Sequence, residues 1–519
     1  MNFLEALKTV DNFTVTENGA NALLSTHDYV LDAFGTLGNF VNIKKEAGFT
    51  GSSFILDTFY KAFAQDKKLA LKYLFYLRDV RGGQGCRTVF KIIIRSLANS
   101  YPQYVLNNLD NILFFGRGDD YLVLLDTPIE KEVIKYLKEV LMEDLSSVRA
   151  GGKCSLLAKW LPSENASSKT TKYYANKLIK GFKFKPAEYR KILSELRANI
   201  NIVETLMSQN KWEDIIFDNV PSKASMIYSD AFYRHVSDKY ENYLENLIIG
   251  KSKVNAKALF PVNIVHEVLK NTYSPSRKDI VLNDALWKAL PNYFEEAGLE
   301  ETGICVVDTS GSMYGTPIEV AISLGLYCAD KAKGPFKNHF ITFSSRPKLQ
   351  EIVGDNIYDK VNSICKANWN MNTNIEAVFN LILNTALTHK LNPEDLPNKI
   401  YIISDMQFDC ASSVSKNKLE TLFESIKRNY EEHGYVMPAI VYWNVSTYTT
   451  GIFQQTASDV QCCMVSGYTP SLFKSVLLGT EYEEVVNENG EKTTKIKLDP
   501  LTIMLKTLND ERYDRVWVG

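Results

Sequence analysis

The sequence predicts a chain in two parts, an all-α N-terminal half followed by a doubly wound α/β domain. Across residues 51–298, apolar side chains recur at helical spacing, as Tyr73 and Leu77 do. Beyond that range, short apolar runs such as 303–307 and 399–403 alternate with helical stretches, which is typical of a parallel sheet covered on both faces. A chain of 519 residues is also too long for a single core, so we expect two to four domains.

Three ranges follow from this change of pattern. We expect residues 1–50 to form an N-terminal segment packed on the rest, residues 51–298 to form the helical part, and residues 299–519 to form the α/β domain. Short glycine-rich turns, at 82–85 and 116–118, separate successive helices of the helical part. Such an order suits either a bundle or an array of helical repeats, and no clean sequence repeat decides between the two.

The α/β half is predicted from five apolar runs and the helical stretches between them. We expect strands at 303–307, 339–343, 399–403, 438–442 and 460–465, and helices near 317–333, 354–366, 374–389, 416–432, 470–478 and 499–508. Strands and helices that alternate at this spacing predict a doubly wound parallel sheet, which binds ligands at the carboxyl ends of its strands.

Composition limits the class of protein. Hydrophobic residues make up 45% of the chain, which excludes a disordered protein, and a formal net charge of −2 excludes a whole-chain attraction to nucleic acid or membrane. No run approaches the roughly 18 to 20 apolar residues that cross a bilayer, and the first residues include Glu5, so we expect no signal peptide and no membrane partner. The eight cysteines form no Cys-x-x-Cys pair, and we expect reduced thiols in a cytoplasmic protein.

Oxygen-bearing side chains follow two of the predicted strands. Asp308, Ser310 and Ser312 come directly after the first apolar run, Asp405 follows another, and Thr373 lies in a loop before a predicted helix. Carboxylates and hydroxyls are hard donors, which suit Mg²⁺, with Mn²⁺ or Ca²⁺ as substitutes. The alternative is a strand-to-helix turn in which the hydroxyls only cap the helix.

This constellation resembles the metal-ion-dependent adhesion site of von Willebrand factor A domains. The resemblance implies that Ser310, Ser312 and Thr373 coordinate the cation through their hydroxyls. It implies that Asp308 and Asp405 bind it directly or through water. One coordination position would then remain open for a carboxylate of a protein partner or for another anion.

A second resemblance covers nearly the whole chain. It rests on a series of short segments in a fixed order, namely Leu77–Gly85, Gly116–Tyr121, Lys159–Ser163, Trp212–Ile215, Val220–Ser222, Ala231–His235, Tyr442–Asn444 and Val465–Ser471. This order resembles a family of cellular and viral proteins related to TROVE-domain proteins such as the Ro autoantigen. The resemblance implies HEAT-like helical repeats, curved or closed into a ring, that bind misfolded or small non-coding RNAs. No RNA-contacting position can be carried over residue by residue.

The segment 149–197 holds a local excess of positive charge, with twelve basic and three acidic residues. The candidates for RNA binding in it are Lys169, Lys172, Lys177, Lys180, Lys183, Lys185, Arg190 and Lys191. Interleaved aromatic residues are Tyr173, Tyr174, Phe182, Phe184 and Tyr189, as a phosphate-binding surface with stacking bases would require. The equally weighted alternative is a solvated helix face whose aromatic side chains pack inward.

A smaller basic cluster, Arg78, Arg81 and Arg87, flanks the glycine-rich turn at 82–85 and is a further RNA candidate. The favoured alternative is a tight turn between helices with ion pairs such as Arg78–Asp79 at its edge. The turn lacks the Gly-Lys-Ser/Thr ending of a Walker loop.

The sequence favours a binding protein over an enzyme. None of the six histidines has a histidine four residues away, and no Gly-x-Ser-x-Gly sequence occurs. The main hypothesis is a Ro-like RNA-binding protein whose α/β domain closes the helical array or recruits an acidic partner through Mg²⁺. The alternative is a metal-dependent protein-interaction or assembly module, cellular or viral, with no RNA role.

Overall fold

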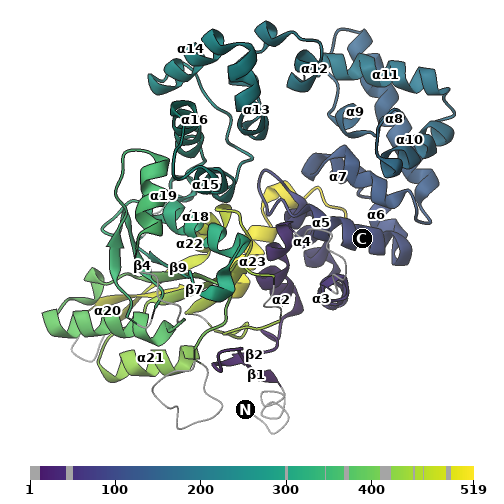
Figure 1. Cartoon of the computed structure of the whole chain (residues 1–519). Helices are drawn as coiled ribbons and strands as arrows, with labels where there is room; N and C mark the ends of the chain where they lie inside the picture. The colour runs from purple at the N-terminus through teal and green to yellow at the C-terminus, as the bar shows by residue number, and fades with distance from the viewer. Residues whose placement is uncertain are drawn as a thin grey trace. The chain divides into compact units, whose positions relative to one another are not determined.

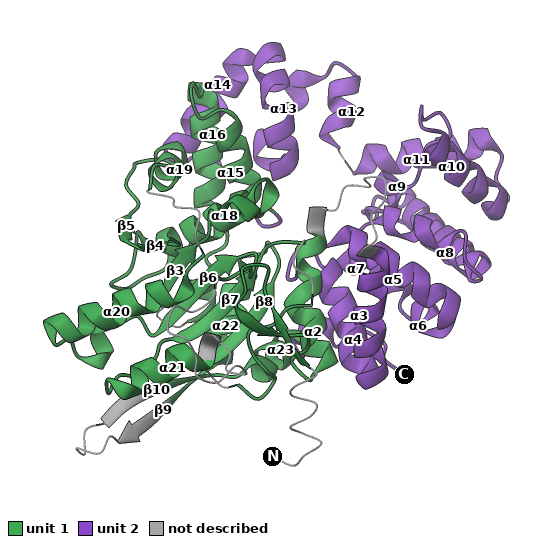
Figure 2. Ribbon diagram, turned by 60° about the horizontal axis from the view of Figure 1, so that its bottom comes forward, with its two compact units in different colours: residues 1–40, 259–508 green, residues 41–258, 509–519 purple. Residues whose placement is uncertain are grey.

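The computed structural model describes residues 12–42, 51–200, 202–298, 302–344, 346–367, 373–409, 422–447, 451–459, 461–486 and 492–519. Two compact units divide the chain, and Figure 2 shows them in different colours. Unit 1 contains Met1–Phe40 and Leu259–Leu508, and unit 2 contains Val41–Ala258 and Asn509–Gly519. The units therefore do not follow the expected ranges, because residues 259–298 cluster with the sheet and residues 509–519 with the helices.

Unit 1 is built on a six-stranded mixed sheet. Its strands are β3 (Ile304–Val307), β4 (His339–Thr342), β5 (Leu349–Glu351), β6 (Lys399–Ser404), β7 (Ala439–Asn444) and β8 (Cys462–Ser466). They are ordered β5-β4-β3-β6-β7-β8, with all neighbours parallel except the antiparallel edge strand β5. The five predicted strands are confirmed, and the three-residue β5 is an addition.

Helices cover both faces of this sheet (Figure 1). They are α18 (Thr316–Lys331), α19 (Ile357–Cys365), α20 (Ile375–His389), α21 (Leu422–Glu432), α22 (Ser471–Gly479) and α23 (Pro500–Leu508), with short 3₁₀ turns η5 (Gly311–Met313) and η6 (Pro393–Asp395). Alternate residues of β6 serve opposite faces, as side chains in strands do. Ile402 joins a core with Phe379 of α20, whereas the Tyr401 ring lies 5.0 Å from the Phe473 ring of α22.

The N-terminal segment is part of unit 1. It forms the hairpin β1 (Phe13–Val15) and β2 (Asn21–Leu23), the helix α2 (Tyr29–Thr36) and the 3₁₀ turn η1 (Leu37–Asn42). Ser466 at the end of β8 donates a hydrogen bond to the Phe34 carbonyl (2.9 Å). Asn39 donates to the Ser446 carbonyl (3.0 Å) and accepts from the Gly467 N–H (2.9 Å). These bonds join positions more than 400 residues apart in the chain.

Three further helices and a hairpin complete unit 1. They are α15 (Pro261–Lys270), α16 (Arg277–Lys288), α17 (Tyr293–Ala297) and the antiparallel pair β9 (Thr480–Val486) and β10 (Lys492–Leu498). α15 packs on α18, and the buried indole of Trp287 donates to Asp330 of that helix (2.9 Å). Helices expected in the helical half therefore stabilise the α/β unit.

Unit 2 consists of helices in the part of the chain that is described. They are α3 (Gly51–Gln65), α4 (Lys67–Arg78), α5 (Arg87–Ser100), α6 (Pro102–Leu106), α7 (Leu109–Phe115), η2 (Gly118–Leu124), α8 (Glu130–Arg149), α9 (Leu157–Trp160), α10 (Lys169–Phe182), α11 (Pro186–Asn199), α12 (Val203–Ser208), η3 (Trp212–Asp214), η4 (Phe217–Asn219), α13 (Ser222–His235), α14 (Ser237–Ile248) and η7 (Glu511–Tyr513). Neighbours in sequence pack on one another, α3 on α4 and α5, α8 on α10 and α11, and α13 on α14. No helix among the described residues is long and apolar enough to cross a membrane.

The last residues of the chain return to unit 2. Arg512 forms an ion pair with the fully buried carboxylate of Asp79, which also accepts a hydrogen bond from the Tyr513 hydroxyl (3.2 Å). The Trp517 N–H donates to the Asn108 side chain (2.8 Å). This segment therefore fastens α4 to the turn before α7.

Two glycines of the N-terminal segment make a matched test of its packing. A Cβ on Gly38 would lie 2.4 Å from the Ser466 carbonyl oxygen, whereas a Cβ on Gly35 would meet nothing closer than 3.5 Å. We expect Gly38→Ala to lower the free energy of unfolding by about 1–3 kcal/mol, because backbone would have to move. Gly35→Ala should be neutral or stabilise by roughly 0.5–1 kcal/mol, since it lies within a helix. Denaturant unfolding measures both, and equal effects would contradict the packing of this segment on β8.

Candidate functional site

The candidate metal site lies at the topological switch point of the sheet. From β3 the chain adds β4 and β5 on one side and then returns to add β6, β7 and β8 on the other. In an open α/β sheet, ligands bind outside the carboxyl ends of the two strands where this reversal occurs. Those strands are β3 and β6, and Asp308 and Asp405 directly follow them. The Asp308 N–H donates to the Ile403 carbonyl (3.1 Å), which keeps the two strand ends in register.

Asp308 is a buried carboxylate held from several sides. One of its oxygens accepts from the Ser404 hydroxyl (2.6 Å), and the other accepts from the Ser310 N–H (2.9 Å). Burial, followed by the nearby negative charge of Asp405, raises the pKa of Asp308 to about 6. Two carboxylates that repel each other in a poorly solvated place are stabilised by a cation between them.

The hydroxyls of the first loop lie close together. The oxygens of Ser310 and Ser312 are 3.1 Å apart, with Ser310 buried and Ser312 exposed to solvent. Gly311 separates them, and nothing lies within 4 Å of the position that its Cβ would take. The loop therefore offers two neighbouring hydroxyl ligands beside Asp308.

Thr373 reaches the same edge through the loop that follows β6. Its buried hydroxyl lies 2.8 Å from the Gln407 carbonyl and 3.2 Å from an Asp409 carboxylate oxygen. Its N–H donates to the other oxygen of Asp409 (3.0 Å), and the Asp409 N–H donates back to the Thr373 carbonyl (3.1 Å). Asp409 was not a candidate, yet it fixes the loop that carries Thr373.

Asn18 is a further residue of this edge that the sequence did not indicate. Its amide donates to the Thr373 hydroxyl (3.2 Å) and to the Gln407 carbonyl (2.7 Å). Nearby, the Thr16 hydroxyl donates to the Phe408 carbonyl (2.7 Å). The turn of the N-terminal hairpin therefore lies on the loop after β6. A turn at Asn18-Gly19 is readable from sequence, but its partners lie more than 350 residues away.

The donors at this edge are two carboxylates and three hydroxyls. Among the residues described, no group of three or more His, Cys, Asp or Glu side chains is arranged to hold a metal ion. A cation bound here would therefore be coordinated partly by serine and threonine. Oxygen donors of this kind are what a hard divalent cation such as Mg²⁺ prefers.

The basic segment on α10 and α11 divides into paired and unpaired side chains. The Lys177 ammonium lies 2.7 Å from Glu130 and also binds Asp126, and Arg190 pairs with Glu164. The remaining lysines are exposed and form no ion pair within the described ranges; they are Lys169, Lys172, Lys180, Lys183, Lys185 and Lys191. We call these six exposed residues of α10, α11 and the turn between them the lysine face.

The aromatic residues of that segment mostly serve the fold. Phe182 and Tyr189 are buried, and the hydroxyls of Tyr173 and Tyr174 bind the Asp126 carboxylate (2.8 and 3.3 Å). Of these four, only Tyr173 is exposed. The lysine face therefore offers charge for phosphates but few rings for stacking bases.

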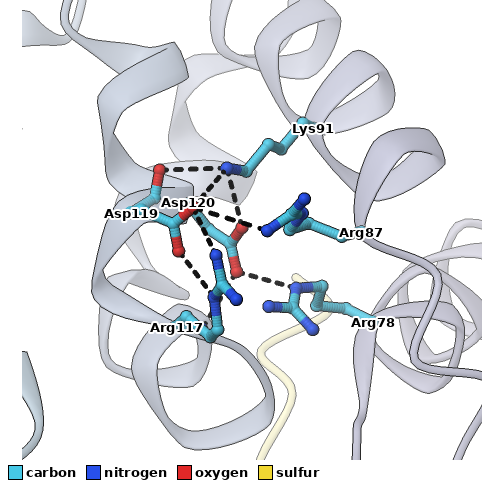
Figure 3. A network of polar contacts seen from close by, with 6 residues as sticks. All are labelled: Arg78, Arg87, Lys91, Arg117, Asp119 and Asp120. Atoms are coloured by element: carbon cyan, nitrogen blue, oxygen red, sulfur yellow. Dashed lines mark hydrogen bonds and ion pairs between the residues drawn. The ribbon is translucent and has the colours of Figure 1, made fainter. Parts of the chain in front are cut away.

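The three arginines near the glycine-rich turn have separate environments. Arg78 is only 1% exposed, and its guanidinium lies 2.7 Å from the fully buried Asp120 carboxylate (Figure 3). Arg81 donates to the Phe114 carbonyl (3.3 Å), whereas Arg87 is 49% exposed and lies 3.9 Å from Asp119. Burial gives Arg78 a structural environment, whereas the side chains of Arg81 and Arg87 are both exposed to solvent.

The turn itself is tight. A Cβ on Gly83 would lie 2.0 Å from the Tyr76 carbonyl oxygen, which also accepts from the Gln84 N–H (3.0 Å). This geometry matches the interpretation as a turn between helices. The prediction of an ion pair between Arg78 and Asp79 is wrong, because Arg78 pairs with Asp120 and Asp79 pairs with Arg512.

Fold and site define a class of chain in which a doubly wound α/β unit, with carboxylates at its switch point, is joined to an all-helical unit. Two family models match, "Domain of unknown function (DUF2828)" over residues 16–116 and 154–298, and "Domain of unknown function (DUF7788)" over residues 302–508. The matches meet beside residue 298, where the pattern of the sequence changes.

The relative "Uncharacterized protein L728" of Acanthamoeba polyphaga mimivirus is 31% identical over 509 residues, which cover 91% of this chain and 86% of that protein. The chain belongs to the family of that protein. These descriptions state no function, so the Ro-type and von Willebrand factor A-type resemblances remain predictions.

The buried pair of Arg78 and Asp120 makes a prediction about stability. Arg78→Ala should lower the free energy of unfolding by about 3–5 kcal/mol, because it leaves Asp120 buried with less compensating charge. The matched variant Arg87→Ala removes the same side chain from an exposed site and should change stability by less than about 1 kcal/mol. Denaturant unfolding compares the two, and equal losses would contradict a structural role particular to Arg78.

Proposed function

We propose that this chain is a non-enzymatic binding protein whose unit 1 holds one divalent cation, in the manner of a von Willebrand factor A domain. The observation that supports this is the position of Asp308 and Asp405 at the ends of the two switch-point strands. The hydroxyls of Ser310 and Ser312 adjoin Asp308, and Thr373 is bonded to the loop after Asp405.

Mg²⁺ fits this donor set best, with Mn²⁺ or Ca²⁺ as substitutes. Hydroxyl and carboxylate oxygens match its preference, and it commonly keeps waters in its coordination sphere. One such water can be replaced by a carboxylate of a protein partner, which would make binding dependent on the cation. The seven cysteines among the described residues form no disulfide, which suits the cytoplasmic location that we also propose.

The cation site is tested by Asp308→Asn, which keeps the size of the side chain and removes its charge. We expect Mg²⁺ affinity to fall at least about tenfold in isothermal titration, with a circular dichroism spectrum like that of the parent. Glu351→Gln is the control, because Glu351 pairs with the first residue of β4 at the opposite end of the strands. Unchanged Mg²⁺ or Mn²⁺ binding in Asp308→Asn would contradict the assignment.

We further propose that unit 2 binds RNA, as the Ro-type resemblance implies. The observation that favours this is the lysine face, six exposed ammonium groups without ion-pair partners in the described part of the chain. Positive charge that the fold leaves unneutralised is available to phosphates and releases counterions when they bind.

Four lysines of this face give the test for RNA. Changing Lys180, Lys183, Lys185 and Lys191 together to Gln should weaken binding of a single-stranded RNA about tenfold or more at low salt. It should also reduce the log–log salt slope by about 0.7 for each phosphate that the variant no longer neutralises. Fluorescence anisotropy measures both quantities.

A variant with the same change in charge is the control for this test. It carries Gln at Lys67, Lys68, Lys251 and Lys253, which are exposed elsewhere on unit 2, and it should bind like the parent. If the two variants bind RNA equally, the lysine face is not the site. If the parent binds no RNA at low salt, a metal-dependent assembly module should replace the RNA proposal.

A further inference from the structure

Unit 2 contains a second cationic cluster, centred on Asp119 and Asp120 of η2 (Figure 3). The Arg117 guanidinium binds Asp119 through two hydrogen bonds of 2.8 Å each. The Lys91 ammonium lies 3.0 Å from Asp119 and 3.3 Å from Asp120. Arg87 lies 3.9 Å from Asp119, at the solvent side of the cluster. Two side chains of α5 and that of Arg117, the residue before η2, thus converge on two carboxylates of η2.

The cluster carries more positive than negative charge. Arg78, Arg87, Lys91 and Arg117 surround two carboxylates, which leaves an excess of two positive charges. Burial acts to raise the pKa of Asp119, but hydrogen bonds from Arg117 and the charge of Lys91 outweigh it and hold that pKa well below its usual value. The Asp119 carboxylate therefore stays ionised. The excess of two positive charges already includes the full negative charge of both carboxylates.

Lys223 adds a third uncompensated charge. Partial exclusion of water, together with the charges of Arg87 and Arg117, lowers the pKa of this lysine. Its side chain is nevertheless exposed. A lysine whose pKa is lowered by burial and by two neighbouring arginines, and whose side chain is still exposed, marks a place of positive potential that a ligand can reach from solvent.

The helix that carries Lys223 adds partial positive charge at its N-terminus. Lys223 is the second residue of α13, a helix of fourteen residues with no acidic residue in its first turn and no side-chain cap. Helix N-termini carry partial positive charge and commonly recruit an acidic or capping side chain. The Lys223 ammonium in this first turn is instead repelled by the charges of Arg87 and Arg117. A bound anion would interact favourably with the positive end of the helix and would reduce the repulsion between Lys223 and the two arginines.

Arg117 is held in a fixed orientation. Its guanidinium carbon lies 3.8 Å from the centre of the Trp160 ring, and the pair with Asp119 fixes its edge. Its side chain remains 29% exposed. A guanidinium that is already oriented loses little conformational entropy when it binds a ligand oxygen.

We propose that Arg87, Arg117 and Lys223 form a binding site for a terminal phosphate group, carried by a nucleotide or by the 5′ end of an RNA. An excess of three positive charges suits a doubly charged terminal phosphate better than a singly charged internal phosphodiester. Planar guanidinium groups match phosphate oxygens in geometry. As a site for RNA ends the proposal rests on the proposed RNA function, whereas as a nucleotide site it does not.

The experiment compares ligands that differ by one phosphate, using the full chain. A ten-nucleotide single-stranded RNA with a 5′-phosphate should bind about tenfold more tightly than the same RNA with a 5′-hydroxyl, as two charge-assisted contacts imply. Likewise, AMP should bind and adenosine should not. Arg87→Gln with Lys223→Gln should abolish both preferences, and circular dichroism should show an unchanged helical fold because both side chains are exposed.

A charge-matched control is Arg95→Gln with Lys251→Gln, which should keep the preference for phosphate. If the parent binds both RNAs equally and AMP no better than adenosine, the site is overturned while RNA binding stands. If the Arg87/Lys223 variant keeps the preference, the site is also overturned. If AMP binds in a way that this variant loses but neither RNA binds, the site holds and the RNA function fails.

Discussion

The arrangement of unit 1 depends on the pairing of β3 with β6. Both strands are buried along their whole length, so polar chemistry can appear only where they end. The register aligns Val307 with Ile403, and the next residues toward solvent bring Asp308 and Asp405 to one place. A shift of one residue in either strand would turn its side chains to the opposite face of the sheet and would change how Asp308 and Asp405 face each other. The candidate cation site is therefore a direct consequence of the register that the core imposes.

The same sheet explains why the N-terminal segment belongs to unit 1. β8 is an edge strand, and an uncovered edge exposes unpaired N–H and C=O groups. α2 packs against β8, and Gly38 approaches Ser466 so closely that no side chain fits between them. The hairpin before α2 then continues to the loop after β6, where Asn18 reaches Thr373. The N-terminal segment thus both covers the edge strand β8 and helps to position the loop of the candidate cation site.

Sequence patterns predicted what depends on local periodicity and missed what depends on distant partners. The five buried parallel strands were readable because each is a continuous apolar run. β5 was not, since its three residues are largely exposed and have no such signal. Asp308 and Asp405 were readable because they follow apolar runs, whereas Asn18 and Asp409 act through bonds to other loops. The boundary at residue 298 marks a change of pattern, but burial of Trp287 against α18 places the preceding helices with the sheet.

The net charge of a sequence segment also does not show which of its charged side chains form ion pairs in the folded protein. In the segment 149–197, Lys177 and Arg190 form ion pairs with carboxylates of unit 2, and two of the five aromatic side chains that suggested base stacking, Phe182 and Tyr189, belong to the core. The turn around Arg117 holds one basic and two acidic residues, Arg117 against Asp119 and Asp120, so its composition does not indicate a cationic site. In the folded unit, cations from two other helices surround this turn, because Arg87 and Lys91 come from α5 and Lys223 comes from α13. The positive charge that unit 2 presents to solvent is therefore a property of the fold, and some of it gathers where the local sequence is not basic.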